Sequence, residues 1–354
     1  SSIPRASDFS FSGTTLGSAT TVNISRASSS FTHTVVYSMG NISQSYGGIS
    51  TSTSFTRPYT DAEQFGANNA SKTGSITVIT YNGGSEIGRK TKNIVMTIPD
   101  NSDTKPVANS TTTITEAVAG IYEKFGAFIQ NNSRALFTFD YSGKYGATIG
   151  EYSVTINDKI SYGSSATITS NILDVNGSVP YTCKIKDSRG RITTETGIIS
   201  VTQYSNPVLT MNVERDENQN ARVNLQGQIT SIGNLNDKSL VVKYKTRSSS
   251  TYQTINVPIS SYTIDESITI PISEYNSYDL YASVSDYFST YNTSVEYLST
   301  SFDLLHFRSD GLGIGIGKKA EYDALDIGMD IYYKGEPFDD YIKGIFDDYD
   351  EEEF

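Results

Sequence analysis

The stretch "ITVITYNGGSEIGRKTKNIVMTIPDNSDTKP", residues 76–106, predicts two strands, the turn between them and a linker. Apolar and polar residues alternate on both sides of the turn, and this two-residue period is that of a half-buried strand. The glycine-rich segment "YNGGSEIG" at 81–88 separates the two runs and is typical of a hairpin turn. The polar segment that follows ends in proline, which predicts a linker.

The same order of features occurs twice more in the chain. "YTCKIKDSRGRITTETGIISVTQYSNP" (181–207) repeats it, and "LYASVSDYFSTYNTSVEYLSTSF" (280–302) repeats it again without the closing proline. Because this period matches the size of a small domain, it predicts an all-β fold of three tandem β-sandwich modules. The expected boundaries are 1–102, 103–205 and 206–303 for the modules, 304–337 for a small glycine-rich β element and 338–354 for an acidic tail.

Alternation recurs along the whole chain. In "SSFTHTVVYSMG" (29–40), every second residue from Phe31 to Tyr37 falls on one face, and His33 lies on that face. One short helix is expected in "TITEAVAGIYEKFG" (113–126), behind a Thr115 cap. Short strands with closely spaced turns favour an immunoglobulin-like architecture, although the Cys–Trp–Cys core of true immunoglobulin domains is absent. Further strands are expected at 74–81, 93–99, 151–157, 239–246 and 266–273, the last at a sheet edge because Pro271 cannot donate to a central ladder.

The composition favours small sandwiches over large α/β enzymes. Of the 354 residues, 36% are hydrophobic, but this fraction includes 25 tyrosines, and there is no tryptophan. Strictly aliphatic residues are therefore too few for the apolar parallel sheets of α/β folds. The single cysteine, Cys183, cannot form an intramolecular disulfide. No long apolar run predicts membrane insertion, and the opening "SSIPRASDFS" does not resemble a signal peptide.

The net charge of −12 is concentrated at the C-terminus. Residues 336–354 contain nine acidic side chains and one lysine, Lys343. We expect a solvated, self-repelling terminus, since it lacks the twelve-residue loop pattern of an EF-hand. No basic stripe is present along the chain, so nucleic acid is not an expected partner.

The segment "DGLGIGIGKKAEYDALDIGMDIYYKG" (310–335) contains glycine at every second position from Gly311 to Gly317. It is not a Walker A loop, because Gly317 and Lys318 are followed by Lys319. The dinucleotide fingerprint also fails, because neither residue 316 nor 318 is the required third glycine. Strict alternation instead predicts a strand whose glycine face another backbone can approach closely. The candidate oligomerisation residues are Gly311, Gly313, Gly315 and Gly317 on one face, with Ile314 and Ile316 on the other.

No catalytic, cofactor-binding or metal-binding residue is predicted. His33 and His306 lie among apolar neighbours and are expected to be half-buried structural histidines. Cys183 falls within a predicted strand and is expected to be a buried bystander. Two isolated histidines and one cysteine do not make a zinc site, and the carboxylates are too scattered to indicate an acid/base pair.

Tyrosine is abundant in the third module, where "SEYNSYDLYASVSDYFSTYNTSVEY" (273–297) contains six. Tyrosine is common on binding surfaces because its amphipathic ring loses little entropy when ordered. Alternation would bury some of these rings and leave the others on a surface that contacts glycan or protein. The candidate contact residues are Tyr275, Tyr278, Tyr281, Tyr287 and Tyr291.

Several segments resemble tail-associated structural proteins of siphophages and prophages of Gram-positive bacteria. They include "RASSSFTHTVVYSMG", "YEKFGAFIQNNSRALFTF", "YGATIGEYSVTIN" and "HFRSDGLGIGIGKKAEYDALDIGMDIYYKGEPF". These immunoglobulin-like virion proteins are often grouped under a domain of unknown function. The resemblance covers nearly the whole chain but not the ending "DDYIKGIFDDYDEEEF". The family supplies no catalytic residues to carry over.

The resemblance implies a non-enzymatic virion protein of the tail, tail tip or a fibre. It would act as a spacer and in adhesion to a bacterial cell-wall glycan or surface protein. The implied partners are copies of the same chain, as a trimer or higher oligomer formed through 304–335, and other phage tail proteins. The alternative is a carbohydrate-binding or adhesive module of a bacterial surface protein. A cell-wall hydrolase with sandwich appendages would need a catalytic domain, for which no segment is left over.

Overall fold

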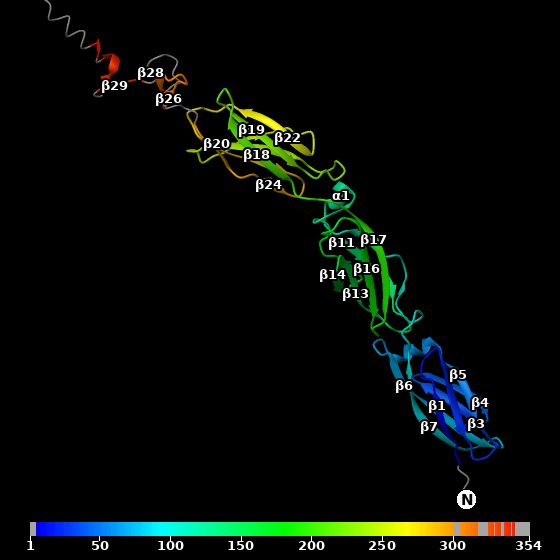
Figure 1. The fold of residues 1–354 in the computed structure, drawn as a ribbon. Coiled ribbons are helices and arrows are strands. Elements are labelled where there is room, and N and C mark those ends of the chain that lie inside the picture. Colours follow the sequence, from blue (N-terminus) through cyan, green and yellow to red (C-terminus); the bar gives the residue numbers. More distant parts are fainter. Residues whose placement is uncertain are drawn as a thin grey trace, which may run out of the picture. The chain divides into compact units, whose positions relative to one another are not determined.

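The structure is a computed structural model that describes residues 5–300, 305–317, 325–328, 330–333, 336–340 and 342–343. Strands and turns make up nearly all of these residues, so the predicted all-β class is confirmed. Contacts divide the chain into two compact units, Ser1–Tyr204 and Ser205–Phe354. Figure 1 shows two sandwiches in the first unit (blue to green) and one in the second (green to orange).

The first sandwich packs a three-stranded sheet, β1-β2-β5, against a four-stranded sheet, β4-β3-β6-β7. Alternation produces the two layers: in β3 every second side chain from Phe31 to Met39 is buried, as the sequence predicts. The core draws Val22 and Phe55 from the small sheet and Tyr37 and Ile76 from the large one. The elements are β1 Asp8–Ser12, β2 Ala19–Ser25, β3 Phe31–Met39, β4 Ile42–Ile49, β5 Ser52–Thr56, the 3-10 helix η1 Tyr59–Phe65, β6 Ser71–Asn82 and β7 Ser85–Thr97.

The second sandwich pairs a three-stranded sheet, β15-β11-β9, with a five-stranded sheet, β10-β17-β16-β13-β14. Its core is separate from the first and contains Phe137, Val154 and Ile185. The short strands β8 and β12 form an extra two-stranded ladder. The elements are β8 Val107–Ala108, β9 Thr113–Glu116, α1 Ile121–Phe125, β10 Phe128–Ile129, β11 Ala135–Thr138, β12 Tyr141–Ser142, β13 Ile149–Ile156, β14 Lys159–Gly163, β15 Thr167–Thr169, β16 Gly177–Asp187 and β17 Ile192–Thr202.

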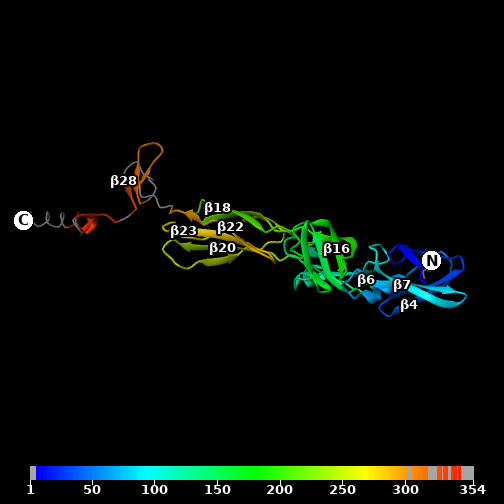
Figure 2. The same cartoon turned by 90° about the horizontal axis from the view of Figure 1, so that it is seen from below.

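The third sandwich has the sheet β18-β19-β22 on one side and β21-β20-β23-β24 on the other, with β25 also paired to β23. Figure 2 shows β18, β20, β22 and β23 gathered in this sandwich. Leu225, Leu280 and Val284 belong to a third, separate core. The strands are β18 Val208–Arg215, β19 Ala221–Gln228, β20 Ser239–Thr246, β21 Gln253–Asn256, β22 Thr263–Ile270, β23 Tyr278–Ser285, β24 Thr290–Asn292 and β25 Glu296–Leu298.

One strand order is used three times. Without the short extra strands, each sandwich pairs its first, second and fifth strands in one sheet. The other sheet contains the fourth, third, sixth and seventh strands in that order. Immunoglobulin-like sandwiches share this two-sheet architecture. The repeated sequence pattern at 76–97, 181–202 and 280–298 corresponds to the sixth and seventh strands of successive sandwiches, while the exact module boundaries stay a prediction.

Two local predictions need correction. The helix expected in 113–126 is restricted to Ile121–Phe125, because Thr113–Glu116 form β9 and Gly120 at the helix start is left-handed. The proposed cap Thr115 therefore lies in a strand, paired with Leu136. The strand expected at 266–273 ends at Ile270, directly before Pro271, and it does lie at a sheet edge.

Candidate functional surfaces

Both ring nitrogens of His33 form hydrogen bonds inside the first sandwich. His33 is 1% exposed, which is more deeply buried than the sequence predicts. Its Nδ1 lies 3.1 Å from the carbonyl of Ile49, and because a carbonyl only accepts, Nδ1 is the donor. Its Nε2 lies 2.9 Å from Ser7 Oγ, which donates to it. His33 is therefore a structural histidine, and the side chain of His306 lies outside the described residues.

Cys183 is closed off from solvent in the second sandwich. It pairs in register with Glu195, whose Oε2 accepts hydrogen bonds from Thr112 at 2.6 Å and Tyr141 at 3.0 Å. Burial, followed by the Glu195 carboxylate, raises the pKa of Cys183 to about 12. Burial and the hydrogen bond to Glu195 likewise raise the pKa of Tyr141 to about 12. A thiol held protonated in a core is inert, as expected for a buried bystander.

Among the described residues, no group of three or more His, Cys, Asp or Glu side chains could hold a metal ion. No helix in that part of the chain has the length and apolar character needed to cross a membrane. The predicted acidic tail, 338–354, lies mostly outside the described residues.

The glycine-alternating segment forms a shorter strand than predicted. β27 spans Ile314–Ile316, antiparallel to β26 (Leu305–Phe307) and parallel to β28 (Leu325–Ile327), with β29 (Tyr332–Tyr333) and β30 (Glu336–Pro337) forming a separate ladder. Gly311 and Gly317 have φ values of 75° and 70°, a left-handed conformation that bends the chain at turns. The strand predicted from the alternation between Gly311 and Gly317 is therefore wrong in its extent. Gly313 and Gly315 are already buried, so the predicted approach surface is not open in the single chain.

The opposite side of this small sheet is apolar and exposed. Phe307, Ile314 and Leu325 are aligned across the three strands, with exposed fractions of 64%, 39% and 59%. Leu305 is also exposed, at 53%, whereas Ile316 is half-buried. We call Leu305, Phe307, Ile314 and Leu325 the apolar face. Contiguous exposed apolar side chains of this kind mark interaction sites in soluble proteins.

The five candidate tyrosines do not form one surface. Tyr278 is 6% exposed and lies in the core, where its hydroxyl accepts a hydrogen bond from Ser273 N at 3.1 Å, so its assignment as a surface contact is corrected. Tyr281 points to the other side of β23. Tyr275 and Tyr287 are exposed, but they lie beyond opposite ends of that strand, a span of roughly 25 Å for eight extended residues. The remaining candidate, Tyr291, is exposed on β24.

A denser aromatic cluster lies on the outer face of the sheet β21-β20-β23-β25. The rings of Tyr252 and Tyr281 meet edge to face with centroids 5.1 Å apart. Lys245 Nζ lies 5.3 Å from the Tyr252 centroid, and Lys243 Nζ lies 5.6 Å from that of Tyr281. We call the six side chains of this cluster the tyrosine–lysine face: Tyr252, Tyr281, Tyr297, Lys243, Lys245 and Arg247.

Strand register assembles this face from separate parts of the sequence. Lys243 is paired with Tyr281 across β20 and β23, and Lys245 is paired with Asp279. Asp279 is in turn paired with Tyr297 on β25, and the Arg247 guanidinium lies 4.6 Å from the Tyr297 ring centroid. Of these members, the sequence indicated only Tyr281 as a contact residue, because strand pairing is what brings the lysines and the tyrosines together. The alternating pattern "VVKYKT" at 241–246, which places both lysines on one face of β20, is the signal that could have found it.

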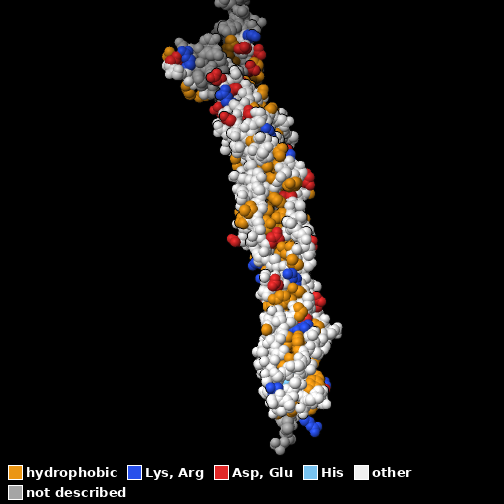
Figure 3. Space-filling view, turned by 90° about the vertical axis from the view of Figure 1, so that its right-hand side faces the viewer, with side chains coloured by type: hydrophobic (Ala, Val, Ile, Leu, Met, Phe, Trp, Pro, Cys, Tyr) orange, Lys and Arg blue, Asp and Glu red, His pale blue; other side chains and the backbone are white. Residues whose placement is uncertain are grey.

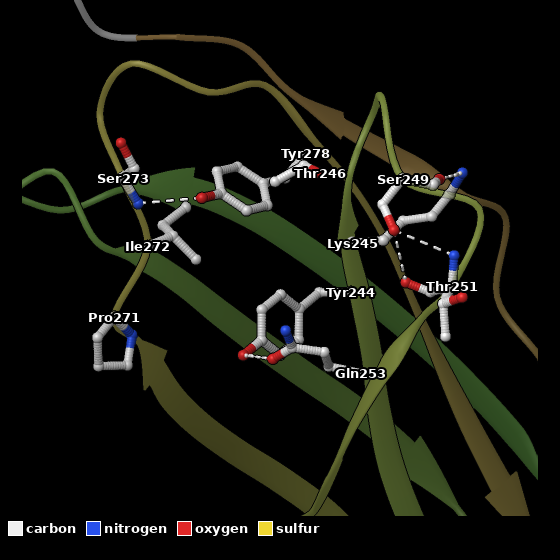
Figure 4. Close-up of a pocket in the computed structure, with 10 residues that line it drawn as sticks. All are labelled: Tyr244, Lys245, Thr246, Ser249, Thr251, Gln253, Pro271, Ile272, Ser273 and Tyr278. Atoms are coloured by element: carbon white, nitrogen blue, oxygen red, sulfur yellow. Dashed lines mark hydrogen bonds between the residues drawn. The ribbon is translucent and has the colours of Figure 1, made fainter.

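A cavity of about 450 Å³ opens between β20, β21 and the segment after β22 (Figure 4). Its polar groups already bond to one another. Tyr244 donates to Gln253 Oε1 at 2.6 Å, and Lys245 donates to the Ser249 carbonyl at 2.8 Å. These groups therefore present little unmet hydrogen-bonding capacity to a ligand.

Within the first unit, the turn between β16 and β17 binds the backbone of the first sandwich. Arg189 Nη2 donates to the carbonyls of Ala62 at 2.9 Å and Gly66 at 3.1 Å. Arg191, which is 4% exposed, donates to Ile98 at 2.7 Å and Pro99 at 3.1 Å. We call these two arginines and the four carbonyls the joint. Buried guanidinium groups that satisfy backbone acceptors fix the geometry at such a contact.

Comparisons with known proteins place the chain in a wider group. Residues 1–343 match a family model described as "Siphovirus protein of unknown function (DUF859)". No curated protein matches the chain.

Among solved structures, the chain is similar to proteins built from repeated modules. Fibronectin(III)-like modules of CbhA from Clostridium thermocellum share 12% identity at a TM-score of 0.24, over 53% of this chain and 88% of that one. A Ca2+-stabilized adhesin with which an Antarctic bacterium binds ice shares 12% identity at a TM-score of 0.37, over 83% and 73%. A two-domain fibronectin type III segment of chicken tenascin shares 12% at 0.28, over 55% and 97%. At such low TM-scores these similarities support no statement about function.

Proposed function

Because the chain belongs to the siphovirus family DUF859, we propose that it is a non-enzymatic structural protein of the phage tail, tail tip or fibre. In this role its sandwiches act as a spacer, and its surface contributes to host attachment. Sandwiches without disulfides, joined by short linkers, are suited to a structural spacer rather than to an enzyme.

The joint is the observation that carries the spacer role. A spacer requires successive domains to hold a fixed angle, whereas domains on plain flexible linkers move independently. Arg189 and Arg191 reach from one sandwich to four backbone carbonyls of the other. Tyr145, beside this turn, also packs its ring against Tyr59 at a centroid distance of 5.7 Å.

A non-enzymatic role is supported by the state of the two side chains most suited to catalysis. His33 uses both ring nitrogens in the core, and Cys183 is buried with a raised pKa. A general base or nucleophile needs access to substrate and a pKa near the working pH. His33 is buried without access to substrate, and Cys183 is both buried and held at a pKa of about 12.

We assign homo-oligomer formation to the apolar face of the C-terminal element. Burying several exposed apolar side chains stabilises an interface by roughly 25 cal/mol per Å². The two residues of this face with the largest exposed fractions, Phe307 at 64% and Leu325 at 59%, flank Ile314 in register. The oligomer therefore forms through the aliphatic side of the segment, with Gly313 and Gly315 packed inside each copy.

Electron microscopy of purified phage particles tests the proposed function. Particles would be incubated with a gold-labelled antibody raised against the purified chain, and pre-immune antibody would serve as the control. We expect label at the tail, its tip or its fibres. Label on the head alone, or on no particle, would contradict the proposal.

A further inference from the structure

The tyrosine–lysine face has a local charge opposite to that of the protein. The chain carries a net charge of −12, yet this face presents three cations, Lys243, Lys245 and Arg247. One carboxylate lies among them, Asp279, whose Oδ2 is 3.7 Å from Lys245 Nζ. Among the described residues, no carboxylate lies within ion-pair distance of Lys243 or Arg247. These two cations are free to pair with an external anion.

The tyrosine rings of the same face add apolar contact area. Tyr297 is 55% exposed, and Tyr252 and Tyr281 are partly exposed. An aromatic ring offers a flat apolar face with negative electrostatic potential, against which the C–H groups of a sugar ring can stack. Four strands at their usual spacing extend the face over roughly 14 Å, which is longer than one sugar ring. On the face seen in Figure 3, the described surface is mostly white, for backbone and for side chains that are neither hydrophobic nor charged, with scattered orange, blue and red side chains.

The position of Asp279 distinguishes between polyanions. A nucleic acid strand carries a phosphate at every step and gains most of its affinity from pairing each one with a cation. Asp279, which lies between Lys245 and Tyr297 in the strand register, would repel such a strand. A carbohydrate chain with spaced anionic groups can pair those groups with Lys243 and Arg247 and direct a neutral hydroxyl to Asp279.

We propose that the tyrosine–lysine face binds an anionic polysaccharide, with sugar rings stacked on the tyrosines and carboxylate or phosphate groups paired with Lys243 and Arg247. This inference rests on the attachment part of the proposed function and names the chemistry of the receptor. It also moves the expected contact from Tyr275, Tyr287 and Tyr291 to a preformed surface on one sheet.

Isothermal titration of the purified chain tests the proposal without phage particles. The probes are polygalacturonate and phosphomannan as anionic glycans, dextran as a neutral glycan, and poly-glutamate and single-stranded DNA as anionic polymers without a matching sugar chain. We expect binding to at least one anionic glycan, weakened by added salt because exposed charges are screened. Dextran, poly-glutamate and DNA are expected to bind at least tenfold more weakly.

Substitutions in the tyrosine–lysine face test whether the glycan binds there. The pair Lys243→Thr and Arg247→Thr removes the free cations, and Tyr281→Thr with Tyr297→Thr removes two rings. Threonine keeps the strand propensity at Lys243, Tyr281 and Tyr297. Arg247 lies in the turn directly after β20. Each pair is expected to weaken glycan binding at least tenfold. The matched control is Lys184→Thr with Lys186→Thr, two exposed lysines with the same spacing on β16 of the second sandwich, and it should bind as the wild type does.

Three results would overturn the inference: no binding to either anionic glycan, equal binding to poly-glutamate or DNA, or equal losses in the control pair. Thermal unfolding of each variant separates lost binding from lost folding. Because the titration uses the isolated chain, a negative result leaves the tail location to be decided by electron microscopy. Tail labelling combined with no glycan binding would retain the structural role and remove this receptor chemistry.

Discussion

At Cys183, burial and a neighbouring negative charge both raise the pKa of the thiol. Both the loss of solvent and the Glu195 carboxylate oppose the thiolate, and together they raise the pKa of the thiol to about 12. The sequence predicted its burial, because "YTCKIKD" alternates and Cys183 falls on the apolar side of the strand. The sequence did not reveal Glu195, because that pairing depends on the β16–β17 register. The same applies to His33, whose partners Ser7 and Ile49 come from other strands or loops.

We expect the native thiol of Cys183 to be unreactive toward Ellman's reagent at about pH 8. At that pH an ordinary cysteine is partly thiolate, whereas a raised pKa and burial should slow the reaction by roughly a hundredfold or more. The rate would be followed by absorbance in buffer and in concentrated guanidinium chloride, where Cys183 should react at once. The matched control is Ser200→Cys in a Cys183→Ala background, an exposed site on the adjacent strand β17. Native Cys183 reacting as fast as the control would show that the core opens readily.

At the scale of elements, alternation in the sequence located strands well and their ends poorly. β3, β6, β13 and β20 all lie where the apolar period of two occurs. The glycine segment failed as one long strand because glycine adopts positive φ at little cost, and Gly311 and Gly317 do so. Glycine alternation alone therefore did not indicate which side of the segment is exposed.

Replacing Phe307 and Ile314 by serine is expected to shift the protein from oligomer to monomer. Both side chains lie on the apolar face, and their removal takes away much of the area that association would bury. Multi-angle light scattering would measure the mass. The matched control is Ile160→Ser with Tyr162→Ser, two side chains exposed at 58% and 73% on the edge strand β14. A monomeric wild type, or an unchanged oligomer in the Phe307 and Ile314 variant, would remove the proposed interface.

The tyrosines of the third module also show where prediction from the sequence fails. Tyr278 and Tyr281 are three residues apart, so alternation sends them to opposite faces of β23, and the structure places one in the core and one outside. Density of tyrosine in the sequence was a poor guide to the surface. The tyrosine–lysine face required the pairing of β20 with β23 and of β23 with β25. Such pairings are set by packing between distant segments, which a single sequence does not reveal.

At the scale of the whole molecule, the repeated order of strand, turn and strand in the sequence was the most informative signal. It predicted three sandwiches. The structure contains three sandwiches, each with a separate core and all with the same strand order. The sequence could not predict that the turn "DSRGR" would also bind the neighbouring sandwich. Nothing in the sequence indicates this contact of Arg189 and Arg191, because their acceptors are backbone carbonyls, which have no signature in the sequence.

Replacing Arg189 and Arg191 by alanine is expected to uncouple the two sandwiches of the first unit. The change removes the arginine donors of four backbone carbonyls, of which Pro99 keeps Thr104 Oγ1 at 2.7 Å and Gly66 keeps Asn69 N at 3.5 Å. A buried carbonyl left without any donor costs about 1–3 kcal/mol. If the joint transmits stability, calorimetry of the wild type should show a single transition for this unit, and the variant should show a second transition at lower temperature. The matched control is Arg222→Ala, which removes an exposed arginine from the outer side of β19 in the third sandwich. If the Arg189 and Arg191 variant unfolds with the wild-type profile, the contact does not hold the two sandwiches at a fixed angle. The spacer role would then have to depend on interactions with other virion proteins instead of on the chain itself.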